Sequence, residues 1–144
     1  MISNLFLIFK SLFFWFSIVI SVLLFGPLVF IAGLLSYSLC LRLSKIWCWY
    51  NIYFLKYVCS LNYSVDLENI NDYRIIISKH QSAWETLFFT AVVDKPIFIL
   101  KRELLLIPIF GWCLFLLKNI SINRARGSAA LNKIMNQCQN QFNM

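Results

Sequence analysis

One apolar segment dominates the first third of the chain. Between Lys10 and Arg42, 31 consecutive residues carry no charge. A transmembrane helix needs about 20 apolar residues, so this segment is long enough to enter a membrane and too long for one straight crossing. Gly26 and Pro27 lie near its midpoint, where proline removes a backbone donor and glycine tolerates a bend. The pattern therefore predicts two half-helices of about fourteen residues, arranged as a re-entrant hairpin or as one kinked, tilted crossing.

Beyond residue 59 the pattern changes to short alternating pieces, which predicts a domain boundary. Residues 1–59 then form a membrane-anchoring helical segment and residues 60–144 a second domain. The predicted strands are 63–67, 74–78, 96–100 and 119–123, and the predicted helices are 83–93, 103–117 with a break near Pro108 and Gly111, and a last one from about 128. The three isoleucines in 74–78 predict a strand buried on both faces. Alternating strands and helices define an α/β class, here a partial βαβα sheet domain behind a membrane-inserted two-helix segment.

Composition narrows the class of protein. The chain is 60% hydrophobic and 13% charged, against about 25% charged residues in an average soluble domain. This balance excludes disorder and argues against a freely soluble protein. The net charge of +7 fits an anionic membrane surface better than a nucleic acid. Five widely spaced cysteines and one histidine indicate neither a disulfide framework nor a zinc site, so we expect no metal.

The turn after the predicted strand 74–78 holds the one histidine of the chain. His80 and Glu85 lie five positions apart, so a carboxylate one turn into the next helix can meet the imidazole. Such a pair fixes the ring's tautomer and stabilises the imidazolium, as a general base requires. The same residues permit a structural interpretation, because Ser82 and Glu85 match a capping box at the start of a helix. Spacing alone leaves both interpretations open.

Basic residues follow the next two predicted strands. Lys101, Arg102 and Glu103 come after the strand 96–100, while Arg124 and Arg126 come after the strand 119–123. Parallel strands end at one edge of a sheet, so these side chains are expected to converge with the His80 turn. Convergent positive charge beside a helix N-terminus favours a phosphate site. The alternative is a solvated basic rim that meets anionic lipid headgroups.

Three stretches resemble the sequence blocks of the glycerolipid acyltransferases, the lysophosphatidate acyltransferase group. HQSAWET is similar to block one, a histidine, four residues and an acid; KRELLLIPIFGW is similar to block two, and SINRARG to block three, in the family's order. The resemblance covers residues 74–130, and the hydrophobic N-terminal hairpin is similar to that of bacterial members. It therefore implies the bacterial inner membrane, with the catalytic part on the cytoplasmic face.

The resemblance implies a reaction and its residues. His80 would be the general base on the free hydroxyl of 1-acylglycerol 3-phosphate, oriented by Glu85, and the oxygen would attack the thioester of acyl-CoA or acyl carrier protein to form phosphatidate. It implies no cofactor, no metal and no covalent acyl-enzyme. Lys101, Glu103 and Arg124 fall on family positions associated with the acceptor phosphate and the floor of the site.

Arg102 and Arg126 are added to the candidate phosphate-binding residues because of their charge alone, not because of the resemblance.

Two departures from the family stand out: Glu85 replaces the usual Asp, and the family's fourth block does not follow residue 126. We therefore expect a truncated chain with low or no turnover. The alternatives are an acyltransferase for another glycerol- or lyso-lipid acceptor, and a catalytically dead membrane protein that binds phospholipid.

Overall fold

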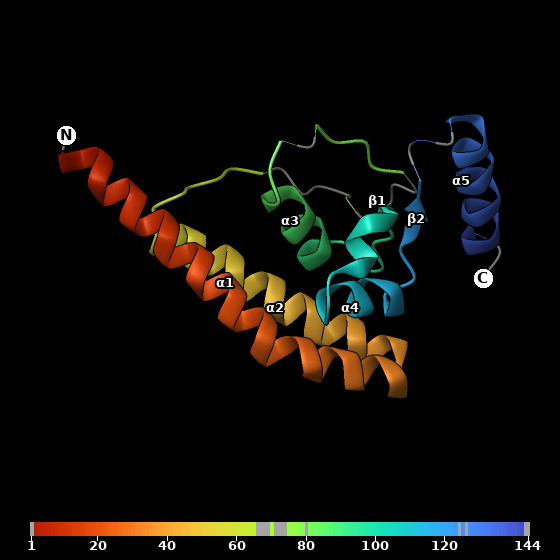
Figure 1. Cartoon of the computed structure of the whole chain (residues 1–144), viewed down its shortest axis with the longest axis horizontal. Coiled ribbons are helices and arrows are strands. Elements are labelled where there is room, and N and C mark those ends of the chain that lie inside the picture. Colours follow the sequence, from red (N-terminus) through yellow and green to blue (C-terminus); the bar gives the residue numbers. More distant parts are fainter. Residues whose placement is uncertain are drawn as a thin grey trace.

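Two long helices form an antiparallel hairpin along one side of the molecule (Figure 1). The computed structural model describes residues 2–65, 70, 75–79, 81–123, 125 and 127–142. Helix α1 spans Ile2–Leu35 and helix α2 spans Tyr37–Tyr57. Within the described residues one helix is long and apolar enough to cross a membrane, over Leu5–Leu35. At 1.5 Å per residue this 31-residue stretch is about 46 Å long, so it exceeds the thickness of a bilayer core.

The predicted break at Gly26 and Pro27 is wrong, because α1 continues through both residues. The chain reverses at Ser36, whose extended backbone (φ −159°, ψ 133°) separates the two helices. A proline inside a helix costs one backbone hydrogen bond, and packing against neighbouring helices can offset that loss. Here Cys113, from a later helix, packs against α1 beside the proline and donates through Sγ to the carbonyl of Gly26 at 3.4 Å, whereas the acceptor that Pro27 leaves without its intrahelical donor is the carbonyl of Leu23. The two-helix segment is therefore α1 against α2, not two halves of α1.

Side-chain hydrogen bonds join the two helices of the hairpin. The indole of Trp47 donates to Ser21 Oγ at 3.0 Å, and the hydroxyls of Ser17 and Tyr50 lie 3.0 Å apart. Each pair joins residues on facing turns of α1 and α2, which fixes the register of the hairpin. Polar pairs between otherwise apolar helices are a common device of helix association in membranes.

The second half of the chain contains a small parallel sheet with helices around it. Strand β1 (Ile99–Lys101) pairs in parallel with β2 (Ile120–Ile122), with Leu100 opposite Ser121. Helix α3 (Trp84–Val92) precedes the sheet, the 3₁₀ helix η2 (Arg102–Leu106) and helix α4 (Phe110–Leu116) connect its strands, and helix α5 (Gly127–Phe142) follows it. These elements confirm the predicted helix 83–93, the break within 103–117 and the last helix. The predicted strand 96–100 is confirmed only at its last two residues, and the predicted strand 119–123 over residues 120–122.

The two earlier predicted strands do not form in the residues that the structure describes. Residues 63–65 and 75–78 have no regular structure, and the remainder of both segments lies outside the described residues. Ile75 is 71% exposed and Ile77 is 94% exposed, so the prediction of a strand buried on both faces is wrong there. A strand is stable only when its backbone pairs with a neighbour, and the described part of the chain supplies none. The described structure is therefore mostly helical, with one two-stranded parallel sheet.

Two apolar clusters hold the helices together. Buried residues of α2 and α3 form the first cluster: Cys48, Ile52, Leu87, Phe88 and Ala91. The second cluster joins the hairpin to α4 through Val29, Cys40 and Cys113. Helix α5 is less covered, because its apolar residues Leu131 and Met135 remain 60% and 55% exposed. The core thus lies between the hairpin and the helices α3 and α4. The division into domains at residue 59 stays a prediction.

Candidate active site

The turn before α3 is organised around the carboxylate of Glu85. Its Oε1 accepts a hydrogen bond from the amide of Gln81 at 3.0 Å, and its Oε2 accepts from the amide and the hydroxyl of Ser82 at 3.1 and 3.0 Å. The hydroxyl of Ser82 in turn accepts from the amide of Trp84 at 3.1 Å. Glu85 reaches back to Ser82 as in the predicted capping box, although the helix begins at Trp84, one residue later than a cap at Ser82 implies.

These donors keep the carboxylate charged. The backbone amide of Gln81 contributes most, with further backbone amides and the Ser82 hydroxyl, and together they lower the pKa of Glu85 from 4.5 to about 2. Hydrogen bonds to the ionised form of an acid stabilise that form selectively. Glu85 is therefore an anion at neutral pH. In the sequence, His80 directly precedes Gln81, the first residue of this turn.

Three predicted site residues, His80, Arg124 and Arg126, lie outside the described residues. The predicted dyad of His80 with Glu85 therefore stays a prediction, as does the convergence of the two arginines on this turn. The Ser82 amide also lies 3.3 Å from Oε1, so the turn already makes four contacts with the two oxygens of Glu85, and the predicted dyad would share a carboxylate that also serves the cap.

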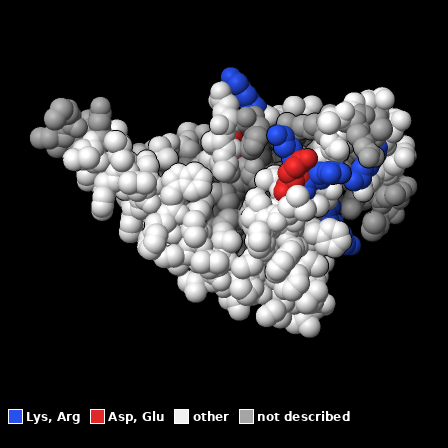
Figure 2. All heavy atoms as spheres, viewed as in Figure 1, with Lys and Arg blue, Asp and Glu red and all other residues white. Residues whose placement is uncertain are grey.

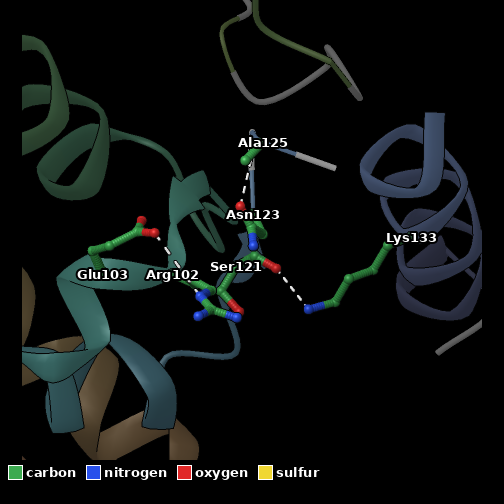
Figure 3. Close-up of polar contacts among 6 residues, drawn as sticks. All are labelled: Arg102, Glu103, Ser121, Asn123, Ala125 and Lys133. Carbon is green, nitrogen blue, oxygen red and sulfur yellow. Dashed lines mark hydrogen bonds and ion pairs between the residues drawn. The ribbon is translucent and has the colours of Figure 1, made fainter. Parts of the chain in front are cut away.

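The remaining charged candidates lie at the end of β1. Lys101 is the last residue of that strand and stands beside Ile122, the last residue of β2. The parallel register thus brings the ends of both strands to one edge, as the sequence predicts. Arg102 and Glu103 follow in η2, where Arg102 Nε lies 3.9 Å from Glu103 Oε1 (Figure 3). Their side chains are 61% and 60% exposed, so this ion pair is weak and leaves both groups accessible to a ligand.

Charge is distributed unevenly over the surface. On the face shown in Figure 2, acidic and basic side chains gather over the part that contains the sheet, while the side of α1 is almost without charge. Exposed apolar side chains follow one another along α1, among them Phe9, Trp15, Phe16 and Leu24. A helix with this many exposed large apolar side chains is typical of a membrane or protein contact.

Two polar residues that the sequence analysis did not identify support the strand ends. Asn119 accepts from the amide of Phe98 at 2.9 Å and donates to the carbonyl of Leu114 at 3.0 Å, so it links β1 to the end of α4. Lys133 of α5 donates to the carbonyl of Ser121 in β2 at 2.7 Å (Figure 3). The bonds from Phe98 to Asn119 and from Lys133 to Ser121 join residues 21 and 12 positions apart, so no local pattern indicates them.

An apolar groove lies on the other side of η2. Its volume is about 460 Å³, and its lining residues come from α1, η2 and α4: Phe30, Leu34, Leu105, Gly111, Trp112, Phe115 and Leu116. Ligand sites are mostly apolar and fall in this range of volumes. Two of the lining residues, Phe30 and Leu34, belong to the candidate membrane helix. The groove is therefore bounded by α1, by Leu105 of η2 and by α4, and its lining residues carry no charge. Among the described residues no three potential metal ligands cluster together.

Comparison with known proteins identifies the class of this chain. The family model described as Acyltransferase matches residues 64–143, which include the His80 turn, β1, β2 and α5. The chain therefore belongs to the acyltransferase family. It is also 37% identical over 132 residues to a 1-acyl-sn-glycerol-3-phosphate acyltransferase of Pseudomonas aeruginosa, with 89% of this chain and 51% of the relative aligned. The chain thus spans about half the length of this relative. No solved structure matches the chain.

Family membership agrees with the character of the surface. The relative is named for a reaction on a lipid, and the chain carries one long apolar helix. Both observations indicate that the chain associates with a membrane.

Proposed function

We propose that this chain takes part in the transfer of an acyl group from a thioester to the free hydroxyl of 1-acylglycerol 3-phosphate, forming phosphatidate. The observation that carries this proposal is the 37% identity with a relative named for that acceptor, over 89% of the present chain. The match to the acyltransferase family over residues 64–143 supports the same reaction class.

The geometry of the described residues is suited to an amphiphilic substrate. Lys101 and Arg102 are exposed at the strand ends, where they can meet a phosphate. Leu105, at the other end of η2, lines the apolar groove. A phosphate and an acyl chain thus find suitable surroundings on either side of one short helix. Arg124 and Arg126 follow β2 in the sequence, and we assign them to the same phosphate.

In the proposed step His80 removes the proton from the acceptor hydroxyl as its oxygen attacks the thioester carbonyl. The new ester bond forms, the carbon–sulfur bond breaks, and the leaving thiolate takes the proton back from the imidazolium. Glu85 stabilises the imidazolium, a role that its low pKa of about 2 supports because the group stays anionic. Glu103 lies next to Arg102, with Oε1 3.9 Å from Nε, and we assign it to the floor of the same site. The donor is acyl-CoA or acyl carrier protein, and no cofactor takes part.

We place the reaction at the cytoplasmic face of a bacterial inner membrane. The basic surplus of the chain supports this orientation, because the cytoplasmic leaflet is rich in anionic lipids. The apolar helix α1 would keep the strand ends close to the lipid surface, where a lysolipid acceptor resides.

The test is acyl transfer by the purified full chain in detergent micelles. Phosphatidate formation from lysophosphatidate and radiolabelled acyl-CoA is compared with that of His80→Ala and Glu85→Gln. Loss of a general base lowers rates by about 10²–10⁴-fold, so both variants are expected to fall at least about 100-fold. Asn132→Ala, at an exposed position of α5, is the control and is expected to keep the wild-type rate.

Turnover by this chain is expected to be low, but it must still exceed that of His80→Ala, and equal rates contradict the proposal. In that case, binding to vesicles that contain phosphatidate separates the alternatives. Equal vesicle binding by wild type, His80→Ala and Glu85→Gln would identify a phospholipid-binding protein without catalysis. Transfer to glycerol 3-phosphate or to a lyso-aminolipid, without transfer to lysophosphatidate, would identify another acceptor.

A further inference from the structure

The turn between η2 and α4 has a strained backbone at Ile109. Its φ of 65° and ψ of −63° lie in a region that β-branched residues rarely occupy. The amide of Phe110 donates to the carbonyl of Pro108 at 2.7 Å, so the three residues form a γ-turn of the rare, strained form. Strain of this kind persists only where the surrounding structure enforces it.

The surrounding structure at this point is helix α1. The Cγ2 of Ile109 fills the space that a Cβ on Gly26 would need, and the Cβ of Ile109 lies 3.6 Å from the same position. One turn further along α4, Cys113 Sγ donates to the carbonyl of Gly26 at 3.4 Å. Gly26 of α1 therefore makes two contacts with this part of the chain. The side chain of Ile109 packs against it, and its carbonyl accepts a hydrogen bond from Cys113 of α4.

A second contact of the same form continues the interface. Gly33, two turns beyond Gly26, has the side chain of Leu116 against it, with Leu116 Cδ1 lying 2.7 Å from the position of a Cβ. Ile109 and Leu116 are seven residues apart, as are Gly26 and Gly33, so the two contacts repeat along both helices. Small residues permit this close approach of helices.

The turn is connected directly to the charged strand end. Ile107 donates through its amide to the carbonyl of Leu104 at 3.4 Å, and Gly111 donates to the carbonyl of Ile107 at 2.8 Å. These bonds join η2, the turn and α4 into one continuous unit. A shift of Ile109 relative to α1 would therefore move η2, together with Arg102 and Glu103.

We propose that Gly26 is a socket for Ile109, and that this contact sets the position of η2 relative to the membrane helix. Ile109 is then a positioning residue. It acts through Arg102 and Lys101, which meet the acceptor phosphate under the function proposed above, and the part of this inference that concerns substrate rests on that function. The coupling itself is a property of the fold and can be tested without activity.

The first experiment follows tryptic cleavage after Lys101 and Arg102 in the detergent-solubilised full chain. Gly26→Ala places a methyl group where Ile109 Cγ2 lies, so cleavage is expected to be about tenfold faster than in wild type. The double variant Gly26→Ala with Ile109→Ala removes Cγ2 and leaves a Cβ at 3.6 Å, an ordinary contact. It is expected to return to within about threefold of the wild-type rate.

The control is Leu24→Ala, a substitution on the same helix two positions before Gly26, where the side chain is 64% exposed. It is expected to leave cleavage after Lys101 and Arg102 unchanged. Wild-type cleavage in Gly26→Ala overturns the proposal. Failure of the double variant to recover also overturns it, because the clash is then not with Ile109.

The second experiment measures acyl transfer to lysophosphatidate by the same variants. Gly26→Ala is expected to raise KM for lysophosphatidate about tenfold with a smaller change in kcat, and the double variant is expected to restore KM. A loss of kcat alone overturns the positioning role. If wild type transfers no acyl group, the proposed function fails while the tryptic experiment still decides the coupling.

Discussion

Asn119 provides the sharpest test of how the strand ends are supported. Its side chain accepts from the amide of Phe98 and donates to the carbonyl of Leu114, at 2.9 and 3.0 Å. Asn119→Leu keeps a similar shape and removes both hydrogen bonds. Each bond contributes about 0.5–1.5 kcal/mol, so the free energy of unfolding should fall by about 1–3 kcal/mol. Urea unfolding in detergent, followed by circular dichroism, measures this difference.

Asn119→Asp separates the two bonds. The aspartate still accepts from Phe98, but its ionised carboxylate has no proton for the carbonyl of Leu114. Protonation of the carboxyl restores a donor, so the stability deficit of this variant relative to wild type should shrink as the pH is lowered. Asn132→Leu, on an exposed position of α5, is the control and should change stability by less than about 0.5 kcal/mol. Wild-type stability of Asn119→Leu would refute the assigned contacts.

Three further predictions concern other parts of the chain. Gly111→Ala should lower the free energy of unfolding by about 1–3 kcal/mol in urea titrations, because its Cβ would press against the backbone carbonyl of Leu105. Trp47→Phe removes the hydrogen bond to Ser21 and should destabilise the hairpin by about 0.5–1.5 kcal/mol, measured by thermal unfolding in detergent. The pKa of Glu85 is lowered to about 2, so its contribution to stability should be complete above pH 4.5 and lost as the pH falls towards 2; Glu85→Gln should lack this dependence in acid titrations.

Each of these predictions has an outcome that contradicts it. Unchanged stability of Gly111→Ala would mean that η2 and α4 separate without cost. Unchanged stability of Trp47→Phe would mean that the hydrogen bond from Trp47 to Ser21 does not stabilise the hairpin. If the stability of wild type and of Glu85→Gln changes with pH in the same way, the amides of the turn do not lower the pKa of Glu85.

The elements that the sequence predicts correctly are those determined by local interactions. Helix α3 follows from the spacing of Ser82 and Glu85 and from an apolar run, and both signals act within one or two turns. It failed where distant segments decide the outcome. Pro27 is a strong local signal for a break, yet α4 packs against the preceding residue and the helix continues. The isoleucines from Ile75 onward favour a strand, but β-branched residues form one only beside a partner.

In the candidate site, too, the sequence predicts what depends on local patterns and misses what depends on distant contacts. The parallel direction of the last two strands could be inferred from the alternation of strands and helices, and this placed Lys101 at the strand end that the structure shows. Asn119 could not be identified, because its partners follow from how the end of α4 meets β1. The coupling of Ile109 to Gly26 spans 83 residues and depends on a backbone conformation that no local pattern favours for isoleucine.

The arrangement around η2 bears on the choice of acceptor. A five-residue 3₁₀ helix is about 10 Å long, so the exposed Arg102 at its start lies within about that distance of Leu105 and the groove beyond it. A water-soluble acceptor such as glycerol 3-phosphate gains nothing from the groove. A lysolipid places its phosphate and its chain in contrasting surroundings at the same time, and the groove opens beside a helix of membrane-spanning length. Among the proposed acceptors, a lysolipid therefore uses more of the described surface than a soluble phosphate ester does.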